Sequence, residues 1–402
     1  MKILMASHYF ASHTGGVEAV AEALFRGLTA REQEVAWLAG DATSPPNPLG
    51  KSRPVSLPIF NFVEERTGLP FPIPTPGALR KISREVSNAD VLILHDCLYL
   101  SNILAFLLAQ FRRVPTIIIQ HTRFTPYSSS VLNAVMRFSN AIVTRPMLSR
   151  AAQVVFISET NRNYFGQLRF RRSPEIVFHG VDTDLYRTLG SAETKAGLRR
   201  EYDLPEDDPV ILFVGRFVEK KGIRAMKRMA ELRPDWTWAF AGWGPLDPGS
   251  WNAPNVRVFS NLRGPSMAAL YRACDLLVLP STGEGFGLVV QEALASGLPV
   301  VCSTETLEAD PARKAFVQGV PVYAGDDDRT AREFVSAIDH LLDSEAGLKN
   351  EFNRSDERRA FALSRYSWHD VVERYLEIAS GLVPESVSHS VPMEASTGEV
   401  RR

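Results

Sequence analysis

Residues 275–301 read DLLVLPSTGEGFGLVVQEALASGLPVV, and this stretch decides the fold. Its apolar start, Asp275–Pro280, predicts a buried strand, and the three glycines that follow let the backbone turn freely and approach a ligand closely. Residues 288–296 then predict a helix, which a glycine and a proline end. A strand, a glycine-rich loop and a helix N-terminus in this order predict an anion site, because free backbone N–H groups and the helix dipole point at one place.

Two glutamates frame this predicted anion site. Glu284 lies in the loop, and Glu292 lies in the second turn of the helix. A carboxylate that accepts hydrogen bonds from paired hydroxyl groups is what sugar recognition requires. With the seven residues between them, the two glutamates resemble the signature of the retaining glycosyltransferases of family 4. The resemblance implies a nucleotide-sugar donor and the GT-B fold.

In the GT-B fold, an α/β architecture, two Rossmann-like domains face each other across a cleft and the C-terminal helix crosses back to the first domain. The chain fits this layout, because strands alternate with helices in two successive halves, as in parallel sheets covered on both faces. We predict an N-terminal acceptor-side domain at 1–182, completed by a returning helix at 367–381, and a C-terminal nucleotide-sugar-binding domain at 183–366. Residues 382–402 have few large apolar side chains and are predicted to be disordered.

The composition is that of an ordinary globular chain and excludes several classes of protein. Hydrophobic residues make up 45% of the 402 residues and the net charge is -1, so no bulk electrostatic argument points to nucleic acid. Cys97, Cys274 and Cys302 have neither metal-site spacing nor an even count, so a reducing cytosol fits. The N-terminus predicts a strand rather than a signal peptide. We therefore expect a cytoplasmic protein.

Contact with the inner face of a membrane is a second expectation about location. The most apolar stretch, residues 98–111, is too short to span a bilayer and predicts a core helix, with a membrane-contacting surface as the alternative. Arg169, Arg171 and Arg172 form a basic cluster that either faces solvent or meets an anionic acceptor or lipid surface. Peripheral membrane contact is therefore an open alternative.

The segment 41–76 is rich in proline and predicts little regular structure. A loop of that length inside a compact domain is usually functional or mobile. We expect the acceptor side of the site to involve this loop and the first domain, where the motifs are weakest.

A basic loop follows the first strand predicted for the second domain. Residues 215–222 read GRFVEKKG, in which Arg216 and Lys221 occupy the two basic positions of the family pattern G-R-x-x-x-x-K-G. The Arg fork and the Lys point charge suit a diphosphate, because they neutralise a leaving group as its negative charge grows. The resemblance implies that both hold the donor diphosphate, helped by the N–H groups of Phe286, Gly287 and Leu288.

The resemblance also implies roles for the two glutamates. Glu284 would bind hydroxyl groups of the donor sugar, and Glu292 would bind the ribose. In this family the leaving phosphate is thought to deprotonate the acceptor on the same face, so no protein base is required. Catalysis then depends on positioning and electrostatics, and the predicted catalytic residues are His121, Glu284, Arg216 and Lys221.

Strand ends in the first domain supply further candidates. Gly15 and Gly16 precede a predicted helix, and the resemblance suggests that they contact the donor phosphate or sugar. His121 follows a predicted strand, and ligands in open α/β sheets sit at the C-terminal ends of strands. A histidine there is placed for proton or sugar-hydroxyl contacts. His95 ends the preceding strand and competes with His121 for this role, and His8 is a third candidate.

Two segments depart from the family pattern. His179 replaces the usual asparagine in Phe-His-Gly-Val-Asp, and we expect a turn in which Gly180 supplies an unusual backbone angle. Trp243 replaces the frequent acidic residue of a Gly-x-Gly-Pro loop near the nucleobase. Whether Trp243 contacts the base or the ribose is left open by this replacement.

No set of metal ligands is evident in the sequence. It lacks His-Glu-x-x-His and paired Cys-x-x-Cys motifs, and the acidic run Asp326–Asp328 predicts a solvated turn. We expect neither a metal nor a cofactor, because Arg216, Lys221 and a helix N-terminus make a divalent cation redundant at the diphosphate.

The predicted function is transfer of a sugar from a UDP- or GDP-sugar to a glycan or lipid-linked acceptor, in cell-surface polysaccharide or glycolipid assembly. One alternative is a catalytically silent GT-B subunit, although the four intact residues Arg216, Lys221, Glu284 and Glu292 argue against it. Another is a GT-B epimerase or phosphorylase, which would need acid–base carboxylates or a cofactor lysine, and neither is identifiable. The donor sugar, the acceptor and the oligomeric state are left open.

Overall fold

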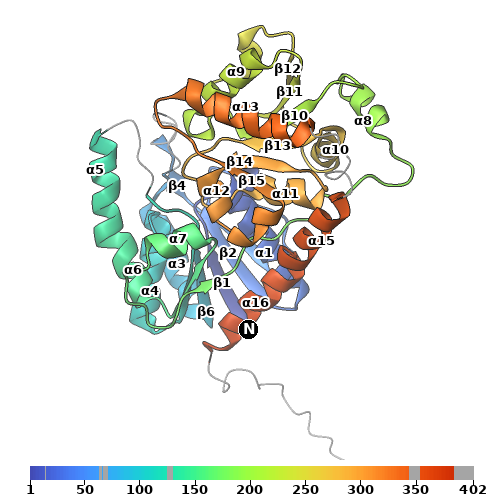
Figure 1. Cartoon of the computed structure of the whole chain (residues 1–402). Helices are drawn as coiled ribbons and strands as arrows, with labels where there is room; N and C mark the ends of the chain where they lie inside the picture. The colour runs from blue at the N-terminus through green and yellow to red at the C-terminus, as the bar shows by residue number, and fades with distance from the viewer. Residues whose placement is uncertain (14, 63–65, 67–70, 125–129, 344–353, 384–402) are drawn as a thin grey trace, which may run out of the picture.

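The structure is a computed structural model that describes residues 1–13, 15–62, 66, 71–124, 130–343 and 354–383. Within these residues, two parallel β-sheets form the centres of two α/β domains (Figure 1). The alternation of apolar strands and amphipathic helices therefore predicts the fold class correctly. The boundary at residues 182 and 183 stays a prediction, and most of the tail predicted to be disordered lies outside the described residues.

The first sheet has the strand order β3-β2-β1-β6-β7-β8-β9, and each neighbouring pair is parallel. Its central strands are completely buried apolar runs, as parallel strands covered on both faces must be. The bounds are β1 (Lys2–Ala6), β2 (Glu34–Gly40), β3 (Arg53–Leu57), β6 (Val91–His95), β7 (Thr116–Gln120), β8 (Gln153–Phe156) and β9 (Glu175–Ile176).

Helices cover both faces of this sheet (Figure 1). The helices of this domain are α1 (Gly16–Ala30), α3 (Pro76–Asn88), α4 (Leu100–Arg112), α5 (Ser130–Ser139), the π-helical turn η2 (Asn140–Thr144), α6 (Arg145–Arg150) and α7 (Glu159–Tyr164). α4 contains most of the apolar stretch 98–111 and buries Asn102, Ala105 and Phe106, which confirms a core helix on this face. In the described part of the chain, no helix is long and apolar enough to cross a membrane.

The second sheet has the strand order β12-β11-β10-β13-β14-β15, again with parallel neighbours. Its strands are β10 (Val210–Arg216), β11 (Thr237–Trp243), β12 (Val256–Phe259), β13 (Leu276–Leu279), β14 (Val300–Ser303) and β15 (Val317–Val320). The helices of this domain are α8 (Lys195–Glu201), α9 (Ile223–Leu232), α10 (Pro265–Ala273), α11 (Leu288–Ala295), α12 (Thr304–Glu308), α13 (Asp327–Asp343) and α15 (Ser355–Arg365).

The proline-rich segment 41–76 contains more regular structure than the sequence predicts. β3 pairs with β2 along its whole length although it contains Pro54. Proline lacks an N–H donor, and the sheet tolerates it because β3 is an edge strand. β4 (Ile59–Phe60) and β5 (Ile73–Pro74) form a further antiparallel pair. The sequence analysis did not predict these short strands.

The acidic run Asp326–Asp328 is exposed, as the sequence predicts, but it opens α13 and does not form a turn. The Asp326 carboxylate accepts a hydrogen bond from the N–H of Arg329 at 2.9 Å. The next two aspartates lie in the first turn of the helix, where the helix dipole favours negative charge.

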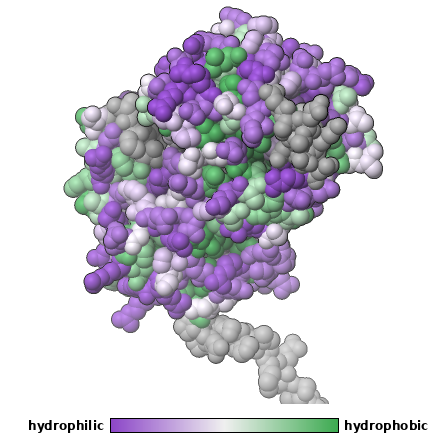
Figure 2. All heavy atoms as spheres, viewed as in Figure 1, coloured by the Kyte–Doolittle hydropathy of each residue, from purple (hydrophilic) through white to green (hydrophobic). Residues whose placement is uncertain are grey.

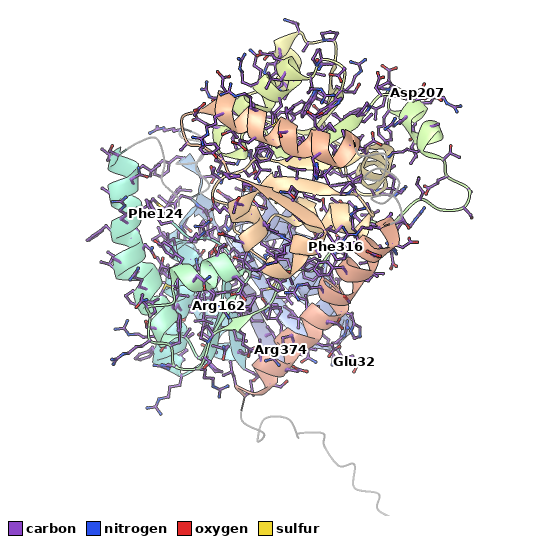
Figure 3. All side chains as sticks on the ribbon, viewed as in Figure 1. Glu32, Phe124, Arg162, Asp207, Phe316 and Arg374 are labelled. Carbon is purple, nitrogen blue, oxygen red and sulfur yellow. The ribbon has the colours of Figure 1, made fainter. Side chains whose placement is uncertain are left out.

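The C-terminal helix α16 (Trp368–Ser380) crosses back to the first domain, as the resemblance implies. Gly27 on α1 leaves room for Val372, since a Cβ at Gly27 would lie 2.3 Å from that side chain. Arg374, labelled in Figure 3, donates from Nε to the Glu175 carboxylate at 2.7 Å. These contacts join the two ends of the chain into one structure.

The strand order of each sheet reverses at one place. β1 and β6 are neighbours, with β2 on the far side of β1 and β7 on the far side of β6, and β10 and β13 stand in the same relation. Open α/β sheets bind ligands at such switch points, outside the carboxyl ends of the strands. The topology therefore directs attention to the loops after β1, β6, β10 and β13.

Candidate active site

Two loops of the second domain pack against each other after β10 and β13. The carbonyl oxygen of Lys220 accepts a hydrogen bond from the N–H of Thr282 at 2.8 Å. Gly222 has a φ of 75°, and a Cβ there would lie 2.5 Å from the carbonyl oxygen of Pro280. Only glycine fits both constraints. The basic loop is thereby held beside the glycine-rich loop.

This packing brings Lys221 and Glu284 together as an ion pair between Nζ and Oε1. Burial alone would raise the pKa of Glu284, but the cations Lys221 and Lys220 outweigh it and hold that pKa below its usual value. Glu284 is therefore ionised at neutral pH and acts only as a hydrogen-bond acceptor. Lys221, which is predicted to bind the diphosphate, therefore lies directly beside Glu284, which is predicted to bind the sugar.

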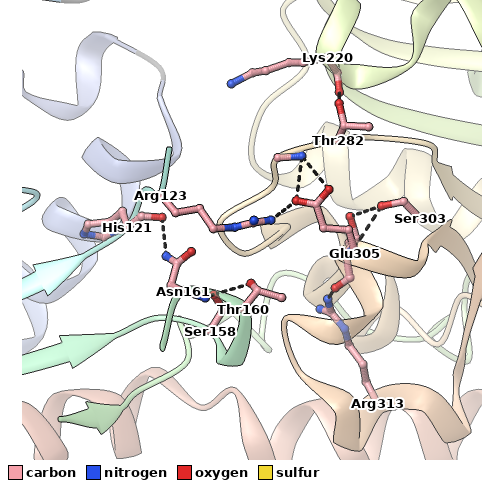
Figure 4. Close-up of polar contacts among 12 residues, drawn as sticks. His121, Arg123, Ser158, Thr160, Asn161, Lys220, Thr282, Ser303, Glu305 and Arg313 are labelled. Atoms are coloured by element: carbon pink, nitrogen blue, oxygen red, sulfur yellow. Dashed lines mark hydrogen bonds and ion pairs between the residues drawn. The ribbon is translucent and has the colours of Figure 1, made fainter. Parts of the chain in front are cut away.

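Lys220 is a third cation at this place, and the family pattern assigns it no role. Figure 4 shows its side chain extending away from Thr282 towards the first domain. Desolvation and the cations Lys221 and Arg216 lower the pKa of Lys220, while Glu284 acts in the opposite direction. Like charges gathered at one place repel each other, so this cluster favours the arrival of an anion.

Arg216 ends β10, and its guanidinium lies over the ring of Trp243, 4.8 Å from the centroid. The two residues are register partners on β10 and β11. The loops behind them are joined as well, because the N–H of Phe217 donates to the carbonyl oxygen of Trp243 at 2.8 Å. Trp243 is 51% exposed and supports Arg216 through a cation–π contact. The departure from the family pattern thus has a structural role beside the predicted diphosphate site.

Glu292 lies on α11 and has partners other than the basic loop. Its carboxylate accepts a hydrogen bond from the hydroxyl of Tyr271 on α10 at 2.7 Å. Burial raises the pKa of Glu292, whereas hydrogen bonds from Tyr271 and Tyr186 act in the opposite direction. Two hydroxyl donors therefore hold the carboxylate, and its predicted ribose contact stays a prediction.

The N-terminus of α11 faces the N-terminus of α1 across the two domains. A Cβ at Gly16 would lie 3.7 Å from the side chain of Leu288. The ring of Phe286 is buried and stacks on Phe178, with 5.3 Å between centroids. Within the described residues, no acceptor takes a hydrogen bond from the N–H groups of Phe286, Gly287 and Leu288. These donors suit the predicted anion.

Asp96, which follows β6, organises the loop that carries His121. One of its carboxylate oxygens accepts from the backbone N–H groups of His121 at 2.8 Å and Thr122 at 3.1 Å. Asn161 donates to the carbonyl oxygen of His121 at 3.0 Å. A Cβ at Gly285 would lie 2.3 Å from the same oxygen. The backbone of His121 therefore meets the glycine-rich loop of the second domain directly.

The sequence treats His95 and His121 as competitors, and the structure instead places them in one stack with His179. Nδ1 of His95 lies 2.9 Å from Nε2 of His121, and the rings of His121 and His179 stack with centroids 5.0 Å apart. Burial lowers the pKa of His121 far below its usual value and lowers the pKa of His95 and of His179 to about 3. All three are therefore neutral. His121 is 3% exposed and faces its histidine neighbours rather than open solvent.

The predicted unusual backbone angle at Gly180 is wrong. The φ angle of Gly180 is not positive. It is needed for space, since a Cβ there would lie 2.4 Å from the ring of Trp368 on α16. The side-chain amide of Gln291 on α11 donates to the carbonyl oxygen of His179 at 2.7 Å. This segment therefore joins the first domain, the second domain and the returning helix.

Glu18 is a buried carboxylate that the sequence motifs did not single out. Its Oε1 lies 2.9 Å from Nε2 of His8 and 3.2 Å from Nδ1 of His13. Burial alone would raise the pKa of Glu18, but its contacts with the two imidazoles hold that pKa well below its usual value. A Cβ at Gly15 would lie 2.1 Å from the same carboxylate. The one feature of the sequence that could have identified Glu18 is its position in the first turn of α1, next to Gly15 and Gly16.

Arg123 forms an ion pair with Glu305 across the two domains (Figure 4). Glu305 also accepts hydrogen bonds from the N–H of Gly283, at 3.0 and 3.1 Å for its two oxygens. Gly283 has a φ of 71°, in the left-handed region that favours glycine. A first-domain side chain thus helps to hold the glycine-rich loop.

A metal site is not evident in the described part of the chain, where no group of three or more His, Cys, Asp or Glu side chains could hold an ion. The expectation that the protein needs no metal remains a prediction, because it concerns activity.

Known protein families match both halves of the chain. Residues 14–185 match the family described as Glycosyltransferase Family 4. Residues 208–344 match the family described as Glycosyl transferases group 1. The two matches together include the glycine pair, the histidine stack, the basic loop and both glutamates.

Curated relatives match part of the chain. The D-inositol 3-phosphate glycosyltransferase of Corynebacterium aurimucosum is 31% identical over 195 residues, which are 42% of this chain and 43% of that protein. The protein of the same name from Mycobacterium bovis is 30% identical over 223 residues, which are 50% of this chain and 42% of that protein. The chain thus spans less than half the length of these relatives.

Solved structures share the fold over nearly the whole chain. Sucrose-phosphate synthase from Thermosynechococcus elongatus superposes with a TM-score of 0.70 at 18% identity, covering 95% of this chain and 99% of that one. HepE from Anabaena, in complex with UDP-glucose, superposes with a TM-score of 0.66 at 18% identity, covering 95% and 100%. At these identities the likeness shows the fold alone, and it confirms the predicted GT-B architecture.

Proposed function

Because the chain belongs to the family 4, or group 1, glycosyltransferases, we propose that it transfers a sugar from a nucleotide-sugar donor to an acceptor hydroxyl group. The ion pair between Lys221 and Glu284 is the observation that carries the proposal. A cation that neutralises a leaving diphosphate and a carboxylate that accepts from sugar hydroxyls must be neighbours, since the sugar is bonded to the diphosphate. An ion pair with a purely structural role would not have to lie where a diphosphate and a sugar meet.

The proposed donor is a UDP- or GDP-sugar. Its diphosphate would lie between Arg216, Lys221 and the N–H groups at the start of α11, while Glu284 would bind the sugar. Lys220 adds positive charge that the family pattern does not require. The co-crystallised UDP-glucose of the Anabaena protein supports a nucleotide sugar as the class of donor.

Retention at the anomeric carbon is part of the proposal. An inverting reaction needs a general base, such as a carboxylate or a histidine, that can reach the acceptor. Two carboxylates that the first domain brings to this edge, Glu18 and Asp96, are each only 2% exposed, and contacts with two histidines hold Glu18 while backbone N–H groups hold Oδ1 of Asp96. A leaving phosphate that takes the acceptor proton on the same face needs no such base. We place the reaction in glycan or glycolipid assembly on the cytoplasmic side of the cell.

The function is tested by screening UDP- and GDP-sugars for stabilisation of the protein against heat. A donor that binds the folded state raises the melting temperature by mass action, and the same donor should release its nucleoside diphosphate when an acceptor is supplied. Stabilisation by at least one donor supports the proposal. A chain that neither binds nor cleaves any donor of the panel would contradict it.

Removal of divalent metal is expected to leave the activity intact. Arg216, Lys221 and the N-terminus of α11 supply the positive charge that a metal would otherwise bring to the diphosphate. The measurement is the initial rate in excess EDTA beside the rate with added Mg²⁺ or Mn²⁺. Complete loss in EDTA that either metal restores would overturn the metal-free assignment.

His121→Ala is expected to lower kcat by about tenfold or more while changing nucleoside diphosphate affinity little. The backbone of His121 touches the glycine-rich loop next to Glu284, whereas Arg216 and Lys221 lie in the basic loop, so we assign the imidazole to the sugar side. Steady-state kinetics and calorimetry with the nucleoside diphosphate separate the two effects, and His340→Ala on α13 is the surface control. Lost nucleotide affinity with an intact kcat at saturation would show that His121 has another role.

A further inference from the structure

α5 carries an apolar stripe that no part of the described chain covers. None of its residues is buried, and four large side chains are exposed: Val131 (75%), Val135 (54%), Phe138 (64%) and, in the following turn η2, Ile142 (54%). Their spacing of four, three and four residues places them on one face of a continuous helical segment. We call these four residues the α5 face.

The α5 face lies at the outer edge of the first domain. α5 stands at the left edge of the molecule in Figure 1, and hydrophobic side chains colour this edge green in Figure 2. A ten-residue helix is marginal in water unless it buries its apolar side, so an exposed stripe of this kind indicates a surface that is covered in use.

The segment of chain that carries the α5 face contains positive charges and no negative ones. From Cys97 to Ser158 the chain has six arginines and neither aspartate nor glutamate, although its overall net charge is -1. Arg137 on α5 and Arg145 at the start of α6 are exposed, and no carboxylate within the described residues pairs with either. The guanidinium of Arg137 lies 5.3 Å from the ring of Phe124, which Figure 3 labels near α5. The surface therefore combines apolar side chains with unneutralised cations.

α4 adds a second feature of the same kind. Leu107 and Phe111 are one turn apart on its exposed side, at 58% and 85% exposure. Arg112 and Arg113 follow directly and are exposed. Exposed apolar and cationic side chains thus occur together on two helices of the same acid-free segment. The combination is therefore not confined to α5.

We infer that the α5 face docks on an anionic lipid surface, with its apolar side chains in the interface and the positive charge of the nearby Arg137 and Arg145 attracted by the headgroups. An amphipathic helix of this composition binds in the plane of a membrane, and anionic lipid supplies the complementary charge. A second copy of the chain is a poor occupant, because a symmetric contact would set the arginines of one copy against those of the other. The inference is independent of the proposed sugar transfer.

Flotation of the full chain with lipid vesicles tests the inference. Vesicles of phosphatidylcholine are compared with vesicles that also contain phosphatidylglycerol. The wild-type chain is expected to float with the anionic vesicles, to bind the neutral ones at least tenfold less, and to be released by high salt. Equal binding to both vesicles, or binding to neither, would overturn the proposal.

Two variants and a control show which residues bind. Val135→Ser with Phe138→Ser and, separately, Arg137→Gln with Arg145→Gln are each expected to reduce binding to anionic vesicles about tenfold or more. All four side chains are exposed, so the melting temperature should not change. Leu232→Ser, at an exposed position in the second domain, is the control and should bind as the wild type does.

The oligomeric state of the same proteins distinguishes a lipid surface from a protein one. Sedimentation of the wild type without lipid is expected to give the same mass as Val135→Ser with Phe138→Ser. A wild-type dimer that this double variant dissociates would assign the α5 face to a second copy and contradict docking on lipid.

Discussion

Lys221→Met is expected to reduce turnover of the donor by about 10²-fold or more. The substitution keeps the length of the side chain and removes the charge that would neutralise the leaving diphosphate. Lys221 is the cation in direct contact with Glu284, so its loss affects both the diphosphate and the sugar carboxylate. Lys227→Met, on the exposed side of α9, removes the same charge from the same domain without approaching the site.

The decrease should appear in kcat as well as in donor affinity, since negative charge on the diphosphate grows in the transition state. Arg216→Gln should act in the same direction, because its guanidinium is held by the Trp243 ring rather than by a carboxylate. Far-UV circular dichroism checks that both variants fold. Near-normal turnover in both folded variants would contradict the assignment of Arg216 and Lys221 to the diphosphate.

Glu284→Gln is expected to lower kcat/KM by roughly 10- to 100-fold, the effect of losing charge-assisted hydrogen bonds to hydroxyl groups. The affinity for the nucleoside diphosphate alone should not decrease, because the substitution releases Lys221 from its ion pair. This opposite behaviour of two neighbouring residues is specific to a donor that has its diphosphate on Lys221 and its sugar on Glu284.

The matched control for this variant is Glu219→Gln, in the neighbouring basic loop but mostly exposed, whose one ion-pair partner among the described residues is Arg224. Calorimetry with the nucleoside diphosphate and kinetics with the donor are needed for each protein. If Glu284→Gln lost affinity for the nucleoside diphosphate and kept its kcat/KM for the donor, the result would contradict the assignment of Glu284 to the sugar.

The second-domain site was largely predictable because its chemistry is local. Gly222 and Gly283 have positive φ angles that their loops require, and Arg216, Lys221 and Glu284 occupy fixed positions beside them. Strand, turn and helix signals in these loops all agree. These short stretches therefore predicted the fold of the domain and the two loops that carry Lys221 and Glu284, but not the ion pair between them.

The first-domain side was less predictable because its contacts join distant segments. His95, His121 and His179 come from three separate segments, and nothing in their spacing indicates a stack. Arg123 and Glu305 are 182 residues apart. Such pairs depend on how the two domains meet, which no local pattern reports.

Two local predictions failed for a shared reason. The prolines of the segment 41–76 indicated irregular structure, yet Pro54 is tolerated because its strand lies at the edge of the sheet. Gly180 indicated an unusual backbone angle, yet it is required by the volume of Trp368. In both cases the tertiary environment, which the sequence signal does not contain, decides what the residue does.

The most direct test of the central claim is calorimetric titration of UDP and GDP into the wild-type chain, Lys221→Met and Lys227→Met. We expect saturable binding of at least one of the two nucleotides to the wild type and to Lys227→Met, and binding weaker by about tenfold or more in Lys221→Met. Equal affinity in all three proteins, or no binding of either nucleotide to the wild type, would contradict it.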